Sequence, residues 1–429
     1  MESNVVDFCR DLIRFDTQNW GEGKSNGERD AAEYCAEIMR KAGLEPHFYE
    51  RESGRTNVVA RMRGSDPEAG ALVVHGHLDV VPAQASDWQV DPFAAEIVDG
   101  MIWGRGAVDM KNMDAMILAS LLQMAEEGHQ PRRDIIFAFF ADEEDNGRYG
   151  AGWLTEAHPE VFEGATEAIS EVGGFSADIA GTRTYLIQTA EKGIHWTKMV
   201  AHGTAGHGSA IHRDNPVVHL AEAVAAIGAH QWPIEYTKTT RALFEQLAEV
   251  TGIPFNPEDP SELIEASGSA GKFIAATLRN TSNPTLLSAG YKHNVVPGQA
   301  EALVDARTLP DQDAKVAATL RELAGENVEF QLMNEGPALE VPFSGTLVEQ
   351  MIQALKDEDP EAVVVPYMLG GGTDNKHLAK LGVTGYGFAP LRLPADLDFT
   401  GMFHGVDERV PVDSLKFGVR TLHRFLLEQ

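Results

Sequence analysis

The stretch that decides the fold is GALVVHGHLDVVP, residues 70–82. Ala71 to Val74 form a continuous apolar run, which predicts a strand buried on both faces, and the run gives way to polar residues at Gly76. His77 and Asp79 therefore follow a strand of the parallel type, and open α/β sheets bind ligands at such strand ends. Since zinc binds imidazole nitrogen and a nearby carboxylate can fix the imidazole tautomer, His77 is a candidate ligand and Asp79 its candidate orienting group. Taken alone, such a pair is more often a structural loop or a hydrogen-bonded turn.

The first third of the chain alternates segments of helical and strand periodicity. The expected helices are 5–15, 28–42 and 112–127, and the expected strands are 57–62, 71–74 and 134–141. Such alternation predicts an α/β sheet with helices on its faces.

Further acidic residues stand at the ends of expected strands or just before an expected helix. Asp109 lies in a glycine-containing turn before a helix, Asp142 to Asp145 directly follow a strand, and Glu171 follows a third strand-like segment. Each of them alone has an ordinary explanation: Asp109 as a helix cap, the run 142–145 as a solvated acidic loop, and Glu171 as part of a turn. Together with His77 they converge on one rim of the sheet, because the strand ends of an α/β unit share an edge. Carboxylates with an imidazole suit two divalent metal ions, most simply zinc, but a second imidazole is missing.

Length, charge and cysteine content limit the classes of function. At 429 residues and 43% hydrophobic content, the chain is expected to form two domains. Its formal charge of -30, from 65 acidic and 35 basic residues, argues against nucleic acid or an anionic membrane surface as a partner. The only cysteines, Cys9 and Cys35, fall in expected helices and imply no disulfide framework. Residues 1–18 carry regularly spaced charges instead of an apolar signal segment, so we expect a cytoplasmic protein.

The pattern changes beyond about residue 188. The segment GIHWTKMVAH (193–202) alternates like a strand with one exposed face, and further strands and helices follow around a helical, loop-rich stretch at 237–285. These elements can form a core of their own, and the α/β rhythm then returns. We therefore expect a catalytic domain formed by 1–187 and 339–429, with an α+β lid or dimerisation domain inserted at 188–338.

The returning segment carries FHGVDERVP (403–411), in which His404 can supply the second imidazole. At this point the chain resembles a known family, the co-catalytic zinc amidohydrolases and exopeptidases that include aminoacylase, carboxypeptidase S, glutamate carboxypeptidase and succinyl-diaminopimelate desuccinylase. The resemblance covers nearly the whole chain, and its motifs in order are HGHLDVVP, GRGAVDMK, ADEE, SEVGG, AGHGS, NVVPG, DARTLP, GGTDN and HGVDERV. The stretch 237–285 carries no motif of this family.

The resemblance implies a zinc-exopeptidase-like fold and a ligand set for two metal ions. His77, Asp109 and Glu171 would hold one ion. Asp109, Glu144 and His404 would hold the other, so that Asp109 bridges the two ions.

The resemblance also implies catalytic and substrate-binding residues. Glu143 would be the general base, a choice between adjacent glutamates that the residues alone leave open. His207 of AGHGS would reach the active site of the other subunit of a homodimer and polarise the scissile carbonyl. The substrate carboxylate would be bound by Arg307, Asn294 and the backbone of Gly371, Gly372 and Thr373.

The implied reaction is hydrolysis of the amide bond of an N-acyl amino acid or dipeptide with a free α-carboxylate, by metal-activated water and without a covalent intermediate. Zinc is the expected metal, with Co²⁺ or Mn²⁺ as alternatives, and the inserted domain is expected to form the dimer. An N-succinyl-diamino acid deacylase is the near alternative, and a non-catalytic metal-bound binding protein is the distant one. A nucleotide-cofactor enzyme is least favoured, because the sequence has neither a P-loop nor a dinucleotide fingerprint.

Overall fold

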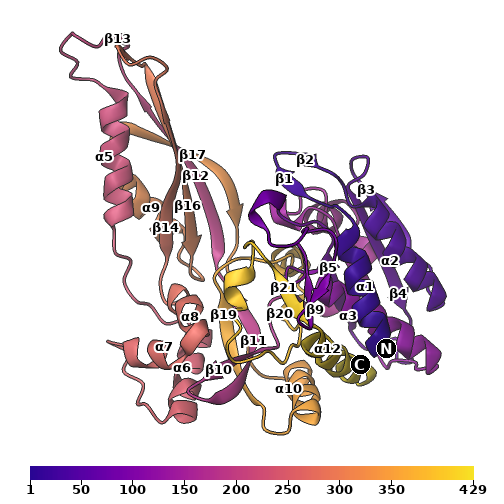
Figure 1. The fold of residues 1–429 in the computed structure, drawn as a ribbon. Coiled ribbons are helices and arrows are strands. Elements are labelled where there is room, and N and C mark those ends of the chain that lie inside the picture. The colour runs from indigo at the N-terminus through magenta and orange to yellow at the C-terminus, as the bar shows by residue number, and fades with distance from the viewer.

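The computed structural model describes residues 1–429 and has two parts, which we call the body and the arm (Figure 1). The body is built on a ten-stranded sheet and the arm on a four-stranded sheet. In Figure 1 the arm extends away from the body and ends in a tip that carries β13 (Gly206–His207). The body has the predicted fold class, an α/β arrangement with a mixed sheet flanked by helices.

The large sheet of the body combines parallel and antiparallel strands. Its members are β3 (His47–Glu50), β4 (Thr56–Met62), β5 (Ala71–His77), β8 (Ile135–Phe140), β9 (Ala165–Ser170), β10 (Phe175–Ile179), β11 (Thr182–Glu191), β18 (Leu339–Glu340), β19 (Val363–Leu369) and β20 (Thr384–Gly387). Their order is β10-β11-β20-β9-β5-β8-β4-β3, and β18 and β19 also pair with β11. The central strands β9, β5 and β8 run parallel, so their carboxyl ends lie at one edge of the sheet.

The central strand β5 is buried on both faces, as its apolar run predicts. Leu72 and Val74 belong to the larger hydrophobic core, whereas Ala71 and Val73 belong to a second core. Side chains alternate between the faces of a strand, so a strand covered on both sides needs apolar residues at successive positions. The strand continues to His77, beyond the predicted end, because its last residues still pair with β8.

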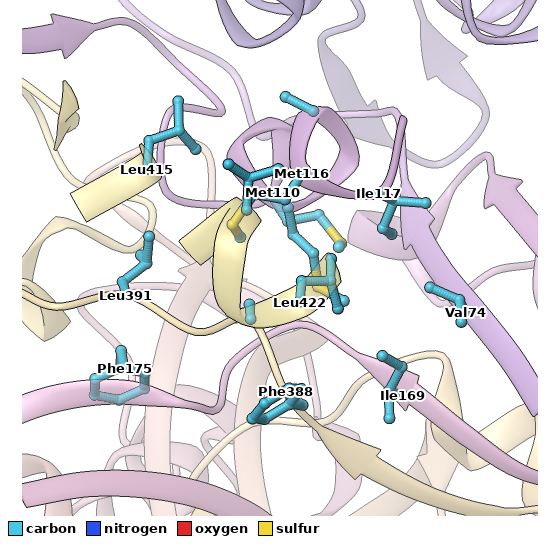
Figure 2. Close-up of a cluster of buried hydrophobic side chains, with 14 of the residues drawn as sticks. Val74, Met110, Met116, Ile117, Ile169, Phe175, Phe388, Leu391, Leu415 and Leu422 are labelled. Carbon is cyan, nitrogen blue, oxygen red and sulfur yellow. The ribbon is translucent and has the colours of Figure 1, made fainter. Parts of the chain in front are cut away.

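Helices cover both faces of this sheet. The larger core joins it to α1 (Glu2–Arg14), α2 (Arg29–Lys41), α3 (Lys111–Glu126), α10 (Thr346–Glu358) and α12 (Val412–Leu427), and the second core joins it to α4 (Ala151–Ala157) and α11 (Asn375–Leu378). Figure 2 shows part of the larger core, with Val74 of β5, Met116 of α3 and Leu422 of α12. The helices predicted in the first third of the chain are confirmed, with small shifts at their ends.

The arm is an antiparallel sheet with helices on one face. Its strands are β12 (Gly193–His202), β14 (Thr281–Ala289), β16 (Gln299–Thr308) and β17 (Val328–Gly336), in the order β14-β16-β12-β17, and its helices are α5 (Pro216–Ala229) and α9 (Asp313–Ala324). Alternate residues of β16, from Ala300 to Ala306, pack in a core with both helices. The residues that alternate with them, including Asp305 and Arg307, therefore point to the uncovered face of the sheet. At the tip, β13 pairs with β15 (Val295–Val296).

Three helices that interrupt the arm in sequence pack against the body. They are α6 (Lys238–Thr251), α7 (Ser261–Ala266) and α8 (Gly271–Ala276). Leu243, Phe244 and Leu247 of α6 are fully buried in the larger core of the body. The chain leaves and rejoins the arm at one place, where the Glu235 N–H donates to the Leu278 carbonyl at 2.9 Å. The boundaries at 188 and 338 stay a prediction, and within them residues 238–276 share the core of the body.

Short strands complete the body. They are β1 (Asn19–Gly21), β2 (Lys24–Ser25), β6 (Ile97–Val98), β7 (Met101–Trp103) and β21 (Arg409–Pro411). None of the helices has the length and apolar character that a membrane span requires.

Candidate metal centre

The carboxyl ends of β5, β8 and β9 bring the predicted ligands together. His77 is the last residue of β5, Glu143 and Glu144 form a short 3-10 turn after β8, and Glu171 follows β9. Asp109 precedes α3 and faces the same rim, where its Oδ1 lies 3.1 Å from His77 Nε2. Parallel neighbouring strands explain this convergence, because they end at a common edge.

The carboxylate of Asp109 lies between the two imidazoles. Its Oδ1 approaches His77, whereas its Oδ2 lies 3.3 Å from His404 Nε2. His404 Nε2 is also 3.1 Å from Glu144 Oε2, and His77 Nε2 is 3.6 Å from Glu171 Oε2. The two groups of residues around Asp109 are those that the resemblance implies for two bridged metal ions.

The chemistry of these side chains fits divalent metal ions. Ligand atoms of His77, Asp109 and Glu144 lie within 4.8 Å of one another, and those of His77, Glu143 and Glu171 form a second such group. Imidazole nitrogen and carboxylate oxygen are the donors that zinc and similar ions bind in proteins.

The pKa values of residues in this cluster also fit a metal-binding role. Burial, together with the negative charge of Asp109, raises the pKa of Glu144 above its ordinary value. Hydrogen bonds to Asp109 and Glu144 raise the pKa of His404 to about 11. Protons on the cluster therefore offset the repulsion between buried carboxylates, and metal binding would release such protons.

Asp79 supports the cluster from beneath. His77 Nδ1 lies 2.9 Å from the backbone carbonyl of Asp79, so it donates to that oxygen and leaves Nε2 facing the rim. The Asp79 carboxylate is 3.6 Å from the same nitrogen, and it accepts the N–H groups of Glu143 and Glu144 at 3.1 and 3.2 Å. The predicted orienting role thus falls largely to the Asp79 main chain, while its side chain fixes the turn that carries both glutamates.

The acidic run 142–145 divides into residues with different surroundings. Asp142 accepts hydrogen bonds from Arg55 at 2.7 Å and Asn19 at 3.0 Å, and Arg55 also pairs with buried Glu28. Asp145 accepts the N–H of an N-terminal loop residue at 2.9 Å. Only Glu143 and Glu144 face the cluster, because Asp142 and Asp145 are held by other parts of the body.

Glu408 is a buried residue that sequence reasoning missed. Its carboxylate accepts the N–H groups of Val108 and Asp109 at 2.6 and 3.0 Å and pairs with Arg105 at 2.8 Å. It therefore holds the loop that presents Asp109. Its place in the HGVDERV motif, four residues after His404, was the available signal.

A pocket of about 610 Å³ opens over the cluster. Its wall includes the acidic rim, Arg307 and Trp196 of the arm, and the glycine loop that contains Gly371 and Gly372. The Arg307 guanidinium lies 5.8 Å from the centre of the Trp196 ring, and its Nε donates to Asp305 at 2.7 Å. Arg307, Gly371 and Gly372 thus line the same cavity as the acidic rim.

The structure does not bring Thr373 to the pocket wall. Its N–H and hydroxyl donate to one oxygen of buried Glu191 at 3.0 and 2.9 Å, so its backbone donor is already engaged. Lys376, three residues later, lines the pocket instead, with Nζ 3.5 Å from Glu143 Oε1. Sequence reasoning missed Lys376 because its motif ended at Asn375.

His207 of β13 and Asn294, which precedes β15, lie together, and β13 is at the tip of the arm (Figure 1). Neither residue lines the pocket of its own chain. His207 is exposed on β13, and the N–H of Gly208 donates to the Asn294 carbonyl at 2.9 Å. Their proposed roles therefore depend on the pocket of a second chain.

An α/β body with imidazole and carboxylate ligands at its parallel strand ends defines the class of candidate metal-dependent hydrolases. Residues 73–428 match the model of peptidase family M20/M25/M40, and the chain belongs to this family of enzymes that hydrolyse amide bonds. The family resemblance drawn from the motifs is therefore confirmed.

Individual relatives extend over most of the chain. It is 27% identical to the N-fatty-acyl-amino acid synthase/hydrolase PM20D1 of Xenopus tropicalis. The alignment, 441 positions long with its gaps, covers 97% of this chain and 84% of that protein. Aminoacylase-1 of Sus scrofa is 25% identical over 399 residues, or 89% and 85% of the two chains. The crystal structure of an M20 family metallo-carboxypeptidase from Sulfolobus solfataricus has the same fold, with a TM-score of 0.74, 20% identity and coverage of 99% and 98%.

Proposed function

We propose that this enzyme binds two divalent metal ions, most simply zinc, and hydrolyses the amide bond of N-acyl amino acids or dipeptides that carry a free α-carboxylate. The observation that carries the proposal is the common pocket, in which Glu143 and the ligand cluster share one cavity with Arg307. The names of the similar hydrolases support this substrate class.

Glu143 is the proposed general base. Metal ions in such a site supply Lewis acidity and make water acidic enough to act near neutral pH. The Asp79 carboxylate fixes the backbone of Glu143, and the Lys376 ammonium lies beside its carboxylate. Glu143 would take a proton from the attacking water and deliver it to the leaving nitrogen, a role commonly worth about 10²- to 10⁴-fold in rate.

Arg307 is the proposed anchor for the substrate carboxylate. A guanidinium offers a planar set of donors that matches a carboxylate. Asp305 holds that plane by accepting from Nε and one Nη at 2.7 and 3.1 Å, and the remaining Nη donors would bind the substrate. Gly371 and Gly372 would add backbone donors, because no side chain there blocks close approach of an anion. An anchored α-carboxylate restricts cleavage to the end of a substrate.

A homodimer through the arm is the proposed assembly. The edge strand β14 exposes Leu286 and Leu287, 51% and 60% accessible, and α5 beside it exposes Val218. An edge strand with exposed apolar side chains is prone to pair with a second chain. Pairing there would place His207 within reach of the partner's pocket, where it would polarise the scissile carbonyl.

The buried, unpaired Cys9 and Cys35 fit the proposed cytoplasmic location.

The test is a substrate panel with the protein loaded separately with Zn²⁺, Co²⁺ or Mn²⁺. The panel contains an N-acyl amino acid, its C-terminal amide, a dipeptide and an N-succinyl diamino acid. We expect hydrolysis of the free acids, a much slower reaction of the amide, and loss of activity after chelation. Selective cleavage of the succinyl compound would favour the desuccinylase alternative. Metal binding without turnover of any member would favour a non-catalytic protein.

A further inference from the structure

The helices α6–α8 contribute one side chain to the wall of the pocket, Phe273 of α8. Its neighbour Ile274 is buried in the core of the body, whereas Phe273 is half-buried. Successive residues of a helix point in different directions, so one residue anchors α8 and the other faces the cavity. This aromatic side chain comes from a part of the chain that carries no family motif.

Phe273 ends a row of aromatic rings that runs to the metal-ligand cluster. We call this set the aromatic row: Phe273, Tyr367, Phe175, Phe399 and Phe403. Its consecutive ring centres are 5.5, 5.9, 5.1 and 5.4 Å apart, the spacing of favourable ring contacts. The three middle rings are buried, and the two end rings line the pocket.

The aromatic row meets the cluster through residues adjacent in sequence. Phe403 precedes His404, and Val172, which also lines the pocket, follows Glu171. Phe403 and Val172 therefore place apolar side chains beside the reacting centre, and the three buried rings hold Phe403 and Phe273 in one packed row. The arm supplies polar groups to the same cavity, among them Arg307 and Asn334, so different side chains are available to the apolar and charged ends of a substrate.

The position of Phe273 is fixed from two sides. Lys192, buried at the junction of body and arm, donates to the carbonyls of Ala276 and Arg279 at 3.3 and 2.9 Å. Gly271 begins α8 so close to α7 that a Cβ there would lie 2.3 Å from the Ile264 carbonyl oxygen. The ring of Phe273 is therefore presented by a helix that is held at both ends, as a preformed binding wall requires.

We infer that Phe273 is a specificity-determining residue, and that the two end rings of the aromatic row, Phe273 and Phe403, bind an extended apolar group, aromatic or long aliphatic, next to the scissile amide. The inference rests on the proposed function and narrows its substrate class. The apolar group belongs either to the acyl part or to the amino acid side chain, and both offer the same chemistry to the row. Apolar contact here lowers the free energy of the bound substrate and of the transition state.

The experiment compares the wild type, Phe273→Ala and the control Phe255→Ala on two substrate series. Phe255 is half-buried in the same helical segment, where it packs on Phe244 at 5.6 Å, and it is absent from the pocket wall. One series lengthens the acyl group from acetyl to hexadecanoyl on a constant amino acid. The other keeps the acetyl group and changes the amino acid from alanine to leucine and phenylalanine.

We expect Phe273→Ala to lower kcat/KM about 10- to 100-fold for the largest apolar member of one series, because a hydrophobic pocket discriminates on this scale. The acetyl-alanine rate should change less than about 3-fold, and Phe255→Ala should leave the selectivity unchanged. The series that responds identifies the group that Phe273 and Phe403 bind. In the Glu143→Gln background, dissociation constants of the same compounds, measured by calorimetry, should follow the same pattern.

An equal loss on all substrates, or no change in selectivity in either series, would overturn the inference and leave the proposed function intact. Inactivity of the metal-loaded wild type on both series and on dipeptides would overturn the proposed function and the inference with it. If Phe273→Ala does not fold, Phe273→Leu provides the test. It keeps apolar volume but removes the ring, and should lower the selectivity for the largest substrates by a smaller factor.

Discussion

The arm sheet and the helices α6–α8 are contiguous in sequence, yet different cores hold them. The arm packs its sheet against α5 and α9, whereas α6–α8 bury Leu243, Phe244 and Leu247 in the body. Each supplies side chains to the pocket, Arg307 and Trp196 from the arm and Phe273 from the helices. Apolar contacts, and not chain order, decide which part of a molecule an element belongs to. In this enzyme they also make different parts of the molecule form two walls of one pocket, one with Arg307 and Trp196 and the other with Phe273.

The two walls of the pocket support catalysis only if they position the scissile amide of the substrate beside Glu143. Glu143→Gln should lower kcat by about 10²- to 10⁴-fold, because the side-chain amide of glutamine cannot take the proton from water. Metal analysis of the variant should still find the ions bound, and Glu144→Ala is the matched variant that should lose metal. Metal loss in the first variant and retention in the second would reverse the assignment of base and ligand.

Arg307 tests the contribution of the arm. Replacing the carboxylate by an amide removes a charge-assisted pair worth roughly 2 to 4 kcal/mol, or about 30- to 1000-fold in kcat/KM. Arg307→Ala should abolish this preference for the free acid, and Arg307→Lys should be nearly as harmful because a point charge does not reproduce the planar fork. The measurement is kcat/KM for one N-acyl amino acid and its amide. Equal wild-type rates on the two compounds would remove Arg307 from the site.

His207 tests whether the tip of the arm serves another chain. Mixing equal amounts of inactive His207→Ala and Glu143→Ala chains should restore about one quarter of the sites, because half of the dimers are mixed and each has one complete site. Activity is measured before and after subunit exchange, with each variant alone as the control. Full activity of a monomeric wild type would contradict the shared site.

Small core substitutions test the separation of arm and helices. Ile274 of α8 is in the core of the body and Ile227 of α5 is in that of the arm. Ile274→Val and Ile227→Val should each cost about 0.5 to 1.5 kcal/mol. Hydrogen exchange should show reduced protection of β11 and β19 in Ile274→Val, and of β12 and β16 in Ile227→Val. The same change in both sheets would mean that the two parts unfold as one unit.

The ligand cluster could be predicted from sequence because burial leaves a local signal. A strand covered on both faces requires an uninterrupted apolar run, and the polar residue that ends it marks the rim, as at His77 and Glu171. The choice of Glu143 over Glu144 came from the family and not from the residues.

Residues that act through distant contacts left no such signal. Glu408 meets the Asp109 loop across about 300 positions of the sequence, and Arg55 meets Asp142 across 87. Thr373 was expected to face the substrate, but its donors are used by Glu191. Helical periodicity over 238–276 is local, whereas the choice between two cores depends on three-dimensional packing.

The junction at which α6–α8 leave and rejoin the arm makes this segment an exchangeable unit. Besides the backbone bond between Glu235 and Leu278, the Trp232 indole donates to Ser282 at 3.0 Å across the same junction. Both ends of residues 236–277 are therefore held side by side before the segment begins. A graft from a relative that keeps the residues buried in the body, such as Leu243, Phe244 and Leu247, would replace one wall of the pocket and leave the arm strands and the metal-ligand cluster unaltered. Selectivity for apolar substrates can thus diversify, in evolution or in the laboratory, separately from the chemistry of hydrolysis.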